Sequence, residues 1–476
     1  RPAREFLILR RLADRHEGRF PKTVLVRIWR EIISATLGLQ GPFSVAAHAS
    51  ENAPACYDLA REHFGYATSI TAHQSTRAVV HAIGEGAATV GGAGHTLIPG
   101  LVMLHEHMFY PSGRARYNTN QFSFPPLYLA GGTTTIRTGG SLDPYTDLSI
   151  RREIDAGRHP GPSMDVTGPY LEGPGGFIWA FPSLSTPDEA RDHVNFWADR
   201  GVTSFKAYNR IDRRTLGAAI EAAHARGIKV TGHLCSITYR EAADLGIDNL
   251  EHGFFAATDW VLDKEPDECP QGARQSYLDL DLESSDFTDL VDHLVRQGVA
   301  LTSTLTVVER GAPGREPPPP GAQRAMLPQL REQVMARLER AGEPGNNRGE
   351  LLEKYMAMEK AFYDAGGFLT VGTDPTGAGD VVAGYANQRA VQLLIEMGLT
   401  VEQAVEVATR NGAIYLEMDD EIGTVEPGKR ADLVLLEGNP LEDVQAFRRM
   451  TVVFKDGVGY DSAKLFDSVK GWVGVR

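Results

Sequence analysis

The chain has 476 residues and a formal net charge of −14 at pH 7. This length exceeds what a single hydrophobic core usually supports, so we expect two or three domains. The acidic balance argues against nucleic acid or an anionic membrane surface as a partner. No uninterrupted apolar run reaches about 18 residues, so no membrane span is predicted. The three cysteines, Cys56, Cys235 and Cys269, predict no disulfide framework and suggest a cytoplasmic, reducing location.

The first 92 residues have the pattern of a small α/β segment. Apolar positions recur at helical spacing over residues 1–40. Gly41 and Pro42 end this pattern, and a strand is expected directly after them. Residues 53–65 predict another helix, and residues 87–91 predict a further short strand.

Eight short apolar strands are predicted after Leu97, with helical segments between most of them. They are expected at residues 101–105, 133–138, 163–168, 202–207, 228–233, 248–252, 299–305 and 368–374. A series of β-then-α units builds a parallel sheet, and eight such units close into a barrel. The predicted fold class is therefore α/β, with a (β/α)8 TIM-like barrel.

Local signals mark the elements around this barrel. Thr186 can cap a helix, with Pro187 at its first position and Glu189 completing a capping box. The proline-rich run at 315–323 starts a long insertion before the eighth strand, which we expect to reach over the site. After Asp420 the pattern becomes β-rich, which predicts a small C-terminal β-segment.

Residue types that bind metals stand at the predicted strand ends. They are His105 and His107 on the first strand, Lys206 on the fourth, His233 on the fifth, His252 on the sixth and Asp374 on the eighth. The active site of a βα barrel lies at this end of the strands, so these side chains should converge. Because side chains alternate along a strand, His105 and His107 face one way and Glu106 the other. Several imidazoles and a carboxylate suit a divalent ion such as zinc.

Lys206 needs a separate explanation, because an ammonium group would be repelled by two dications. Carboxylation of its amine by carbon dioxide would create an anionic oxygen ligand able to span metals about 3.5–4 Å apart. The alternative is a lysine paired with a nearby carboxylate at the barrel mouth.

Six motifs together resemble the amidohydrolase superfamily of metal-dependent hydrolases, in its prolidase-like, imidazolonepropionase-like and hydantoinase-like members. They are IPGLVMLHEH, TSFKAY, VTGHLC, LEHGFF, TVGTDPTG and EIGTVEPGKRADLVLLEGNPLEDV, within residues 95–476. The resemblance implies two metal ions. His105, His107 and Asp374 would bind the more buried ion. His233 and His252 would bind the more exposed one, and carboxylated Lys206 would bridge both.

The activity implied by the resemblance is hydrolysis of a C–N bond in a small molecule: an amide, a peptide (as in a dipeptidase) or a cyclic amide. A hydroxide bridging the metals would attack the carbonyl, with Asp374 acting first as general base and then as general acid. One alternative is a mononuclear imidazolonepropionase-like hydrolase in which Lys206 is only structural. Another is a catalytically inactive fusion with a role in assembly. Mononuclear deaminases of the superfamily carry a glutamate where this chain has Ser236, which counts against deamination.

Candidate substrate contacts lie near the ends of the second, third and fourth strands. They are Arg137, Tyr170, Tyr208, Asn209 and Arg210. An arginine there would suit a substrate carboxylate by bidentate pairing, although a structural arginine is at least as good an interpretation. Cys235 is interpreted as a packed thiol. Homo-oligomerisation is left open.

Residues 1–92 resemble a different family. The stretch up to residue 46 is similar to the later helices of a bacterial chorismate mutase, and the following residues to the segment that trails that domain. The family's first long helix, with a catalytic arginine, would precede Arg1, which argues against mutase activity. The predicted domains are 1–92, 93–415 for the barrel and 416–476 for a partial β-sandwich. The C-terminal β-segment is expected to lack the N-terminal strands with which it would pair.

Overall fold

The structure is a computed structural model, and it describes residues 44–48, 69–73, 94–111, 117–176, 178, 180–375 and 381–474. The chain divides into two compact units, residues 1–96 with 437–439 and residues 97–436 with 440–476. In the first unit, β1 (Ser44–His48) pairs in parallel with β2 (Ser69–His73). The first of these is the strand expected after Pro42. The helices predicted at 1–40 and 53–65, the strand predicted at 87–91 and the resemblance to chorismate mutase concern residues outside the described ones.

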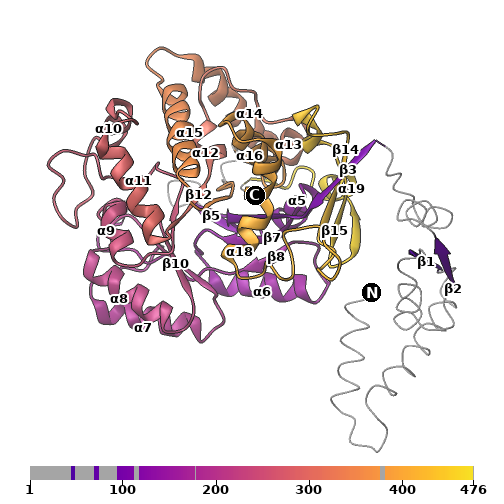
Figure 1. The fold of residues 1–476 in the computed structure, drawn as a ribbon, viewed down its shortest axis with the longest axis horizontal. Coiled ribbons are helices and arrows are strands. Elements are labelled where there is room, and N and C mark those ends of the chain that lie inside the picture. The colour runs from indigo at the N-terminus through magenta and orange to yellow at the C-terminus, as the bar shows by residue number, and fades with distance from the viewer. Residues whose placement is uncertain are drawn as a thin grey trace, which may run out of the picture. The chain divides into compact units, whose positions relative to one another are not determined.

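Eight parallel strands form the barrel in the second unit, and Figure 1 shows helices around this part of the chain. They are β4 (Leu101–Glu106), β7 (Thr133–Thr138), β8 (Ser163–Asp165), β9 (Ser204–Ala207), β10 (Lys229–Gly232), β11 (Asn249–Glu251), β12 (Ala300–Ser303) and β13 (Leu369–Val371). Every one falls within or overlaps a predicted strand. All residues of β4 and β7 are buried, as expected for strands packed on both faces.

The sheet closes on itself through two sets of contacts. Parallel ladders run through β4-β7-β8 and through β9 to β13 in chain order. Isolated bridges from Thr167 to Ser204 and from Leu171 to Ala207 join the chain after β8 to β9. The amide of Asp374 donates to the carbonyl of His105 at 2.9 Å, which joins the chain after β13 to β4. These contacts confirm the predicted (β/α)8 barrel.

Helices cover the outside of the barrel. They include α5 (Phe124–Ala130), α6 (Pro144–Asp155), α7 (Pro187–Ala198), α8 (Arg213–His224), α9 (Tyr239–Asp244), α10 (Ala273–Asp279), α11 (Ser285–Gln297) and α16 (Tyr385–Glu396). The hydroxyl of Thr186 accepts from the amide of Glu189, so the predicted cap of α7 is confirmed. The Glu189 carboxylate accepts from the amide of Ser185, one residue before the position that a capping box requires.

The insertion between β12 and β13 is helical. It contains α12 (Leu305–Glu309), α13 (Pro320–Ala325), α14 (Pro328–Glu339) and α15 (Arg348–Asp364). After α16 the chain continues through α17 (Val401–Glu406), a π-helical turn (Val407–Asn411) and α18 (Gly412–Tyr415). Among the described residues, no helix is both long and apolar enough to cross a membrane.

The C-terminal segment forms a four-stranded sheet with a strand that precedes the barrel. Its order is β16 (Val458–Asp461), β15 (Met450–Lys455), β14 (Leu433–Glu437) and β3 (His95–Pro99). The prediction that the C-terminal β-segment would find no N-terminal strand is therefore wrong.

Only Gly100 separates β3 from β4. The amide of Gly100 donates to the carbonyl of Asp432. A side chain at this position has no room, because its Cβ would lie 2.1 Å from the Thr134 hydroxyl.

Candidate metal centre

Three buried ligand groups meet where β4 and β13 end. One ligand atom from each of His105, His107 and Asp374 can be chosen so that all lie within 4.8 Å of one another. Nε2 of His107 is 3.1 Å, and Nε2 of His105 is 3.7 Å, from Oδ1 of Asp374. Imidazole nitrogens and a carboxylate oxygen are ligands that zinc commonly takes in proteins. The group therefore fits a divalent metal ion.

The other three predicted ligands lie beside this group. The ring of His252 is 4.5 Å from that of His105 and 4.6 Å from that of His233, measured between centroids. Nζ of Lys206 is 3.1 Å from Nε2 of His105, and Nδ1 of His252 is 3.9 Å from Oδ2 of Asp374. The six side chains therefore converge at the C-terminal ends of five strands.

Two of these residues have left-handed backbone conformations. The φ angle is 66° at His252 and 49° at Asp374. Residues other than glycine adopt positive φ rarely, and such strain is concentrated at functional sites. Each of the two follows the last residue of its strand closely, so its side chain is released from the alternating direction that the strand imposes.

Burial controls the protonation of the cluster. It lowers the pKa of His105 to about 4 and, together with Lys206, the pKa of His233 to about 3. It also lowers the pKa of Lys206 to about 8. Burial alone would raise the pKa of Asp374, but His107 and His105 hold it well below its usual range. Neutral imidazole and ionised carboxylate are the forms that bind metals.

Glu251 is a buried member of the site that the sequence pattern did not reveal. Its Oε2 accepts from Nδ1 of His105 at 2.6 Å, and its Oε1 accepts from the hydroxyl of Thr231 at 2.6 Å. Burial would raise the pKa of Glu251, but Arg137 and then His105 hold it well below its usual range. An ionised carboxylate on Nδ1 leaves Nε2 of His105 facing the cluster, the arrangement usual for metal-binding histidines.

Arg137 supports this carboxylate from inside the barrel. The side chain is 1% exposed. Its Nη2 donates to Oε1 of Glu251 at 2.5 Å, and its Nε donates to the carbonyl of Leu104 at 2.8 Å. We therefore assign Arg137 to the positioning of Glu251 and do not retain the substrate contact predicted for it.

Glu106 faces away from the ligands, as the alternation along β4 predicts. Its Oε1 accepts from the side-chain amide of Asn387 at 2.9 Å and from the amide of Thr373 at 3.1 Å, and its Oε2 accepts from the Thr373 hydroxyl. Burial raises the pKa of Glu106 to about 8. The side chain thus fixes the residue that precedes Asp374.

An aromatic cluster flanks the ligands on the side of the third and fourth strands. Tyr170 stacks on Phe181 with ring centroids 3.9 Å apart, and Tyr208 meets Tyr170 edge-on at 5.2 Å. The ring of Tyr208 lies 4.9 Å from that of His233. Of the predicted substrate contacts, Tyr170 and Tyr208 are therefore brought next to the candidate metal ligands.

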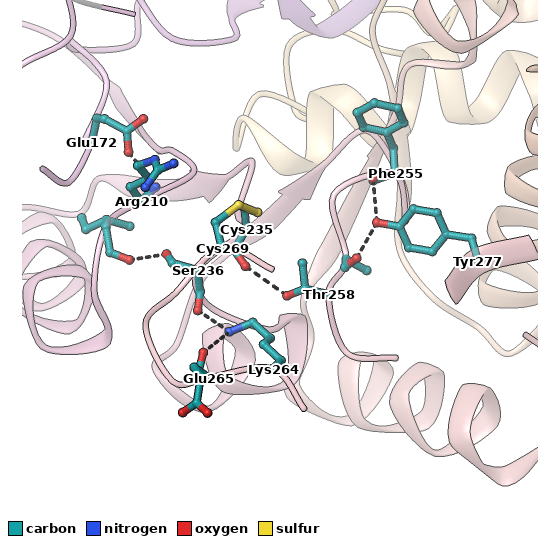
Figure 2. The surroundings of a disulfide bond; sticks show 12 residues. Glu172, Arg210, Cys235, Ser236, Phe255, Thr258, Lys264, Glu265, Cys269 and Tyr277 are labelled. Carbon is teal, nitrogen blue, oxygen red and sulfur yellow. Dashed lines mark hydrogen bonds between the residues drawn. A yellow bond between two sulfur atoms is a disulfide. The ribbon is translucent and has the colours of Figure 1, made fainter. Parts of the chain in front are cut away.

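Asn209 and Arg210 lie farther along the same loop. The carbonyl of Asn209 accepts from the amide of Ser236. The amide of Arg210 donates to Oε1 of Glu172 at 2.7 Å (Figure 2), and the Arg210 side chain is exposed. The hydroxyl of Ser236, at the position of the deaminase glutamate, donates to the carbonyl of Ile211.

A disulfide joins Cys235 to Cys269, with their Cα atoms 4.9 Å apart (Figure 2). The prediction of a packed Cys235 thiol without a disulfide is wrong, because barrel closure brings together the loops after two neighbouring strands, β10 and β11. Thr258 also donates to the carbonyl of Cys235, and Lys264 to that of the next residue. The loop after His233 is thus tied to the loop after β11. The prediction of a reducing cytoplasm rests on the absence of disulfides, so this disulfide does not support it.

The family of the chain follows from comparison with known proteins. The model of the amidohydrolase family matches residues 96–458. The chain belongs to the amidohydrolase family. An imidazolonepropionase of Porphyromonas gingivalis is 37% identical over 81 residues, which are 17% of this chain and 19% of that protein's length.

Two solved structures share the fold of this chain. A Xaa-Pro dipeptidase with methionine bound in its active site has a TM-score of 0.56 and 21% identity, covering 77% of this chain and 87% of that one. A bottromycin amidohydrolase has a TM-score of 0.59 and 22% identity, covering 79% of each chain.

Proposed function

We propose that the protein is a metal-dependent hydrolase that cleaves a C–N bond in a small molecule. The observation that carries this proposal is the convergence of His105, His107 and Asp374 within 4.8 Å, next to three further groups that can bind metal. The family of the chain agrees with this chemistry.

The proposed centre holds two divalent ions, with zinc as the expected metal. His105, His107 and Asp374 would hold one ion. His233 and His252 would hold the other, and carboxylated Lys206 would supply an oxygen ligand to the centre. Only a neutral amine attacks carbon dioxide, and burial lowers the pKa of Lys206 to about 8, so a useful fraction of its amine is neutral near physiological pH.

The residues around the centre have distinct roles in the proposed reaction. Bound divalent ions lower the pKa of water and polarise a substrate carbonyl. Asp374 holds the proton taken from water and returns it to the leaving nitrogen, because an unprotonated amine is a poor leaving group. Glu251, held by Arg137, keeps Nε2 of His105 directed at the centre.

The proposed substrate is an amide, a peptide or a cyclic amide. Tyr170 and Tyr208 lie next to the ligands and would pack on it, whereas Asn209 and Arg210 lie where a longer substrate could reach them. Screening amides, dipeptides and cyclic amides with the metal-loaded protein tests this range. Failure to turn over any compound of the three classes, with metal fully loaded, would count against the proposal.

Metal analysis of the purified protein tests the centre itself. We expect close to two divalent ions per chain. The Lys206→Ala variant should lose one ion and most activity, and short-chain carboxylic acids should restore part of the activity by replacing the missing bridge. A metal-free protein with all six residues intact would contradict the proposal.

A mononuclear hydrolase is the second candidate. In the described part of the chain, only His105, His107 and Asp374 form a group of carboxylate, histidine or cysteine ligands tight enough for one ion, and an imidazolonepropionase is among the relatives. This alternative predicts one ion per chain and no change in metal content in Lys206→Ala.

A further inference from the structure

A cavity of about 270 Å³ lies among α12, α14, α16 and the proline-rich turn before α13. Seven arginines and two glutamates line it, in a chain whose net charge is −14. None of the six metal-ligand candidates is among its lining residues. The cavity is therefore a concentration of positive charge apart from the proposed metal centre.

Two of the arginines are neutralised by carboxylates. Arg315 and Arg389 share Glu309, each at 2.7 Å. The same two arginines share Glu396, at 2.5 and 2.7 Å. These four side chains form a closed network, so Glu309 has little acceptor capacity left for other donors in the cavity.

Arg448, at the end of a 3₁₀-helix (Val444–Arg448), stands outside this network. Its Nη1 is buried and has no hydrogen-bond partner. Burial, and then the neighbouring Arg389, lowers the pKa of Arg448. The residue as a whole is half-buried, and a guanidinium nitrogen that is buried without an acceptor is unfavourable, because a donor taken out of water costs free energy unless it is paired.

A second cavity, of about 400 Å³, adjoins the first and shares Pro319, Tyr385 and Arg448 with it. Gln388 lines this second cavity, and its Nε2 is also buried without a hydrogen-bond partner. Both buried unpartnered groups are donors. Glu316 and Asp467 also line the two cavities, but neither Nη1 of Arg448 nor Nε2 of Gln388 has an acceptor, which is what a bound anion would supply.

Apolar side chains also line the first cavity, among them Val334, Leu338, Val381 and Val382. We propose that the joined cavity binds a small organic carboxylate with an apolar body, whose carboxylate pairs with Arg448. Guanidinium groups match carboxylates in bidentate geometry. The two volumes, about 270 and 400 Å³, together fall within the range of small-molecule sites.

Calorimetric titration of the full chain tests the site, with 4-phenylbutyrate as the probe and 4-phenylbutan-1-ol as its neutral counterpart. The carboxylate should bind with a stoichiometry near one and at least tenfold more tightly than the alcohol. Because carboxylates also ligate metal ions, the titration is repeated on metal-depleted protein, where the same affinity is expected. Equal affinity for the alcohol, preference for inorganic phosphate, or loss of binding with the metal would overturn the proposal.

Arg448→Gln locates the bound carboxylate. It should weaken 4-phenylbutyrate binding at least tenfold and raise the melting temperature of the free protein, since it removes a half-buried charge whose Nη1 has no acceptor. Arg449→Gln is the matched control, because this neighbouring guanidinium pairs with Asp443 at the surface, and it should leave binding unchanged. An unchanged affinity of Arg448→Gln for 4-phenylbutyrate would contradict the proposal. If that variant does not fold, the affinities of 4-phenylbutyrate and 4-phenylbutan-1-ol for the wild-type chain still test whether the cavity binds a carboxylate.

Discussion

The carboxylate of Glu251 lies 2.6 Å from Nδ1 of His105, and both side chains are fully buried. This contact fixes the tautomer of His105, because an ionised carboxylate can only accept. The imidazole then presents the unprotonated Nε2 to the proposed metal centre. Arg137 holds the other oxygen of Glu251, so the orientation of a ligand on β4 depends on residues from β7 and β11.

Glu251→Gln should weaken metal binding by about 10–100-fold, the usual effect of removing the partner of a metal-binding histidine. The melting temperature should also fall, because the buried charge of Arg137 loses its counter-ion. Metal titration with a competing chelator measures the first effect. Glu221→Gln, an exposed glutamate paired with Arg191, is the control and should change neither quantity.

Asp374→Asn should reduce turnover by a factor of about 10²–10⁴, the usual contribution of a positioned acid–base group. The amide cannot take up or return the proton, although it can still occupy the same space. Steady-state kinetics on any substrate found in the screen measures the effect. Asp364→Asn, on the exposed end of α15 beside Lys360, should retain full activity; a comparable loss there would show that the effect is not specific.

Glu359 predicts a pH dependence of stability. Burial raises its pKa to about 8, above its ordinary value near 4.3 in an unfolded chain. The folded state thus holds this proton more tightly, so its contribution is fully present below pH 4.3 and is lost as the pH rises through 8. Glu359→Gln cannot ionise, and its melting temperature relative to wild type should rise between pH 5 and pH 9.

The free-energy gain of this variant at pH 9 should be on the order of a few kcal/mol. Thermal unfolding at several pH values measures it. Glu353→Gln, an exposed glutamate on the same helix, should give a difference that does not change with pH. A constant difference for Glu359→Gln as well would show that the buried carboxyl keeps an ordinary pKa.

Reduction of the Cys235–Cys269 disulfide should destabilise the protein. The cysteines are 34 residues apart, and closing a loop of that size stabilises by about 3–4 kcal/mol in the chain-entropy account. Thermal unfolding with and without dithiothreitol measures the loss. The double variant Cys235→Ser, Cys269→Ser should have the lower melting temperature and no longer respond to the reductant; a continued response would show that another group is its target.

The barrel and the converging ligands could be predicted because both depend on repeated local patterns. Each predicted strand is a short apolar run, and His105, His107, Lys206 and His233 stand at the ends of such runs, where barrel geometry gathers them. The role of Glu251 could not be predicted from the alternation of side chains along a strand. Glu251 directly precedes His252, so strict alternation would direct the two side chains to opposite faces. The positive φ of His252 breaks that alternation.

Pairings between distant segments could not be predicted from the sequence. The bond between Cys235 and Cys269 depends on β10 and β11 being neighbours in the closed barrel. The sequence places Arg137 near the end of a strand, which predicts contact with a substrate. Its counter-ion, Glu251 on β11, is found only in the closed barrel. The partner of β14 could not be predicted for a related reason: only Gly100 separates β3 from β4, so no connecting loop in the sequence marks them as two strands.

The single residue between β3 and β4 has a mechanical consequence. Gly100 is held by Asp432 and has no room for a side chain, so one nearly continuous extended segment runs from the small sheet to His105. A force applied to the chain before His95 would reach the first proposed metal ligand without a loop to absorb it. A tag or tether attached upstream therefore needs a slack linker, so that tension does not pass to the strand that carries His105.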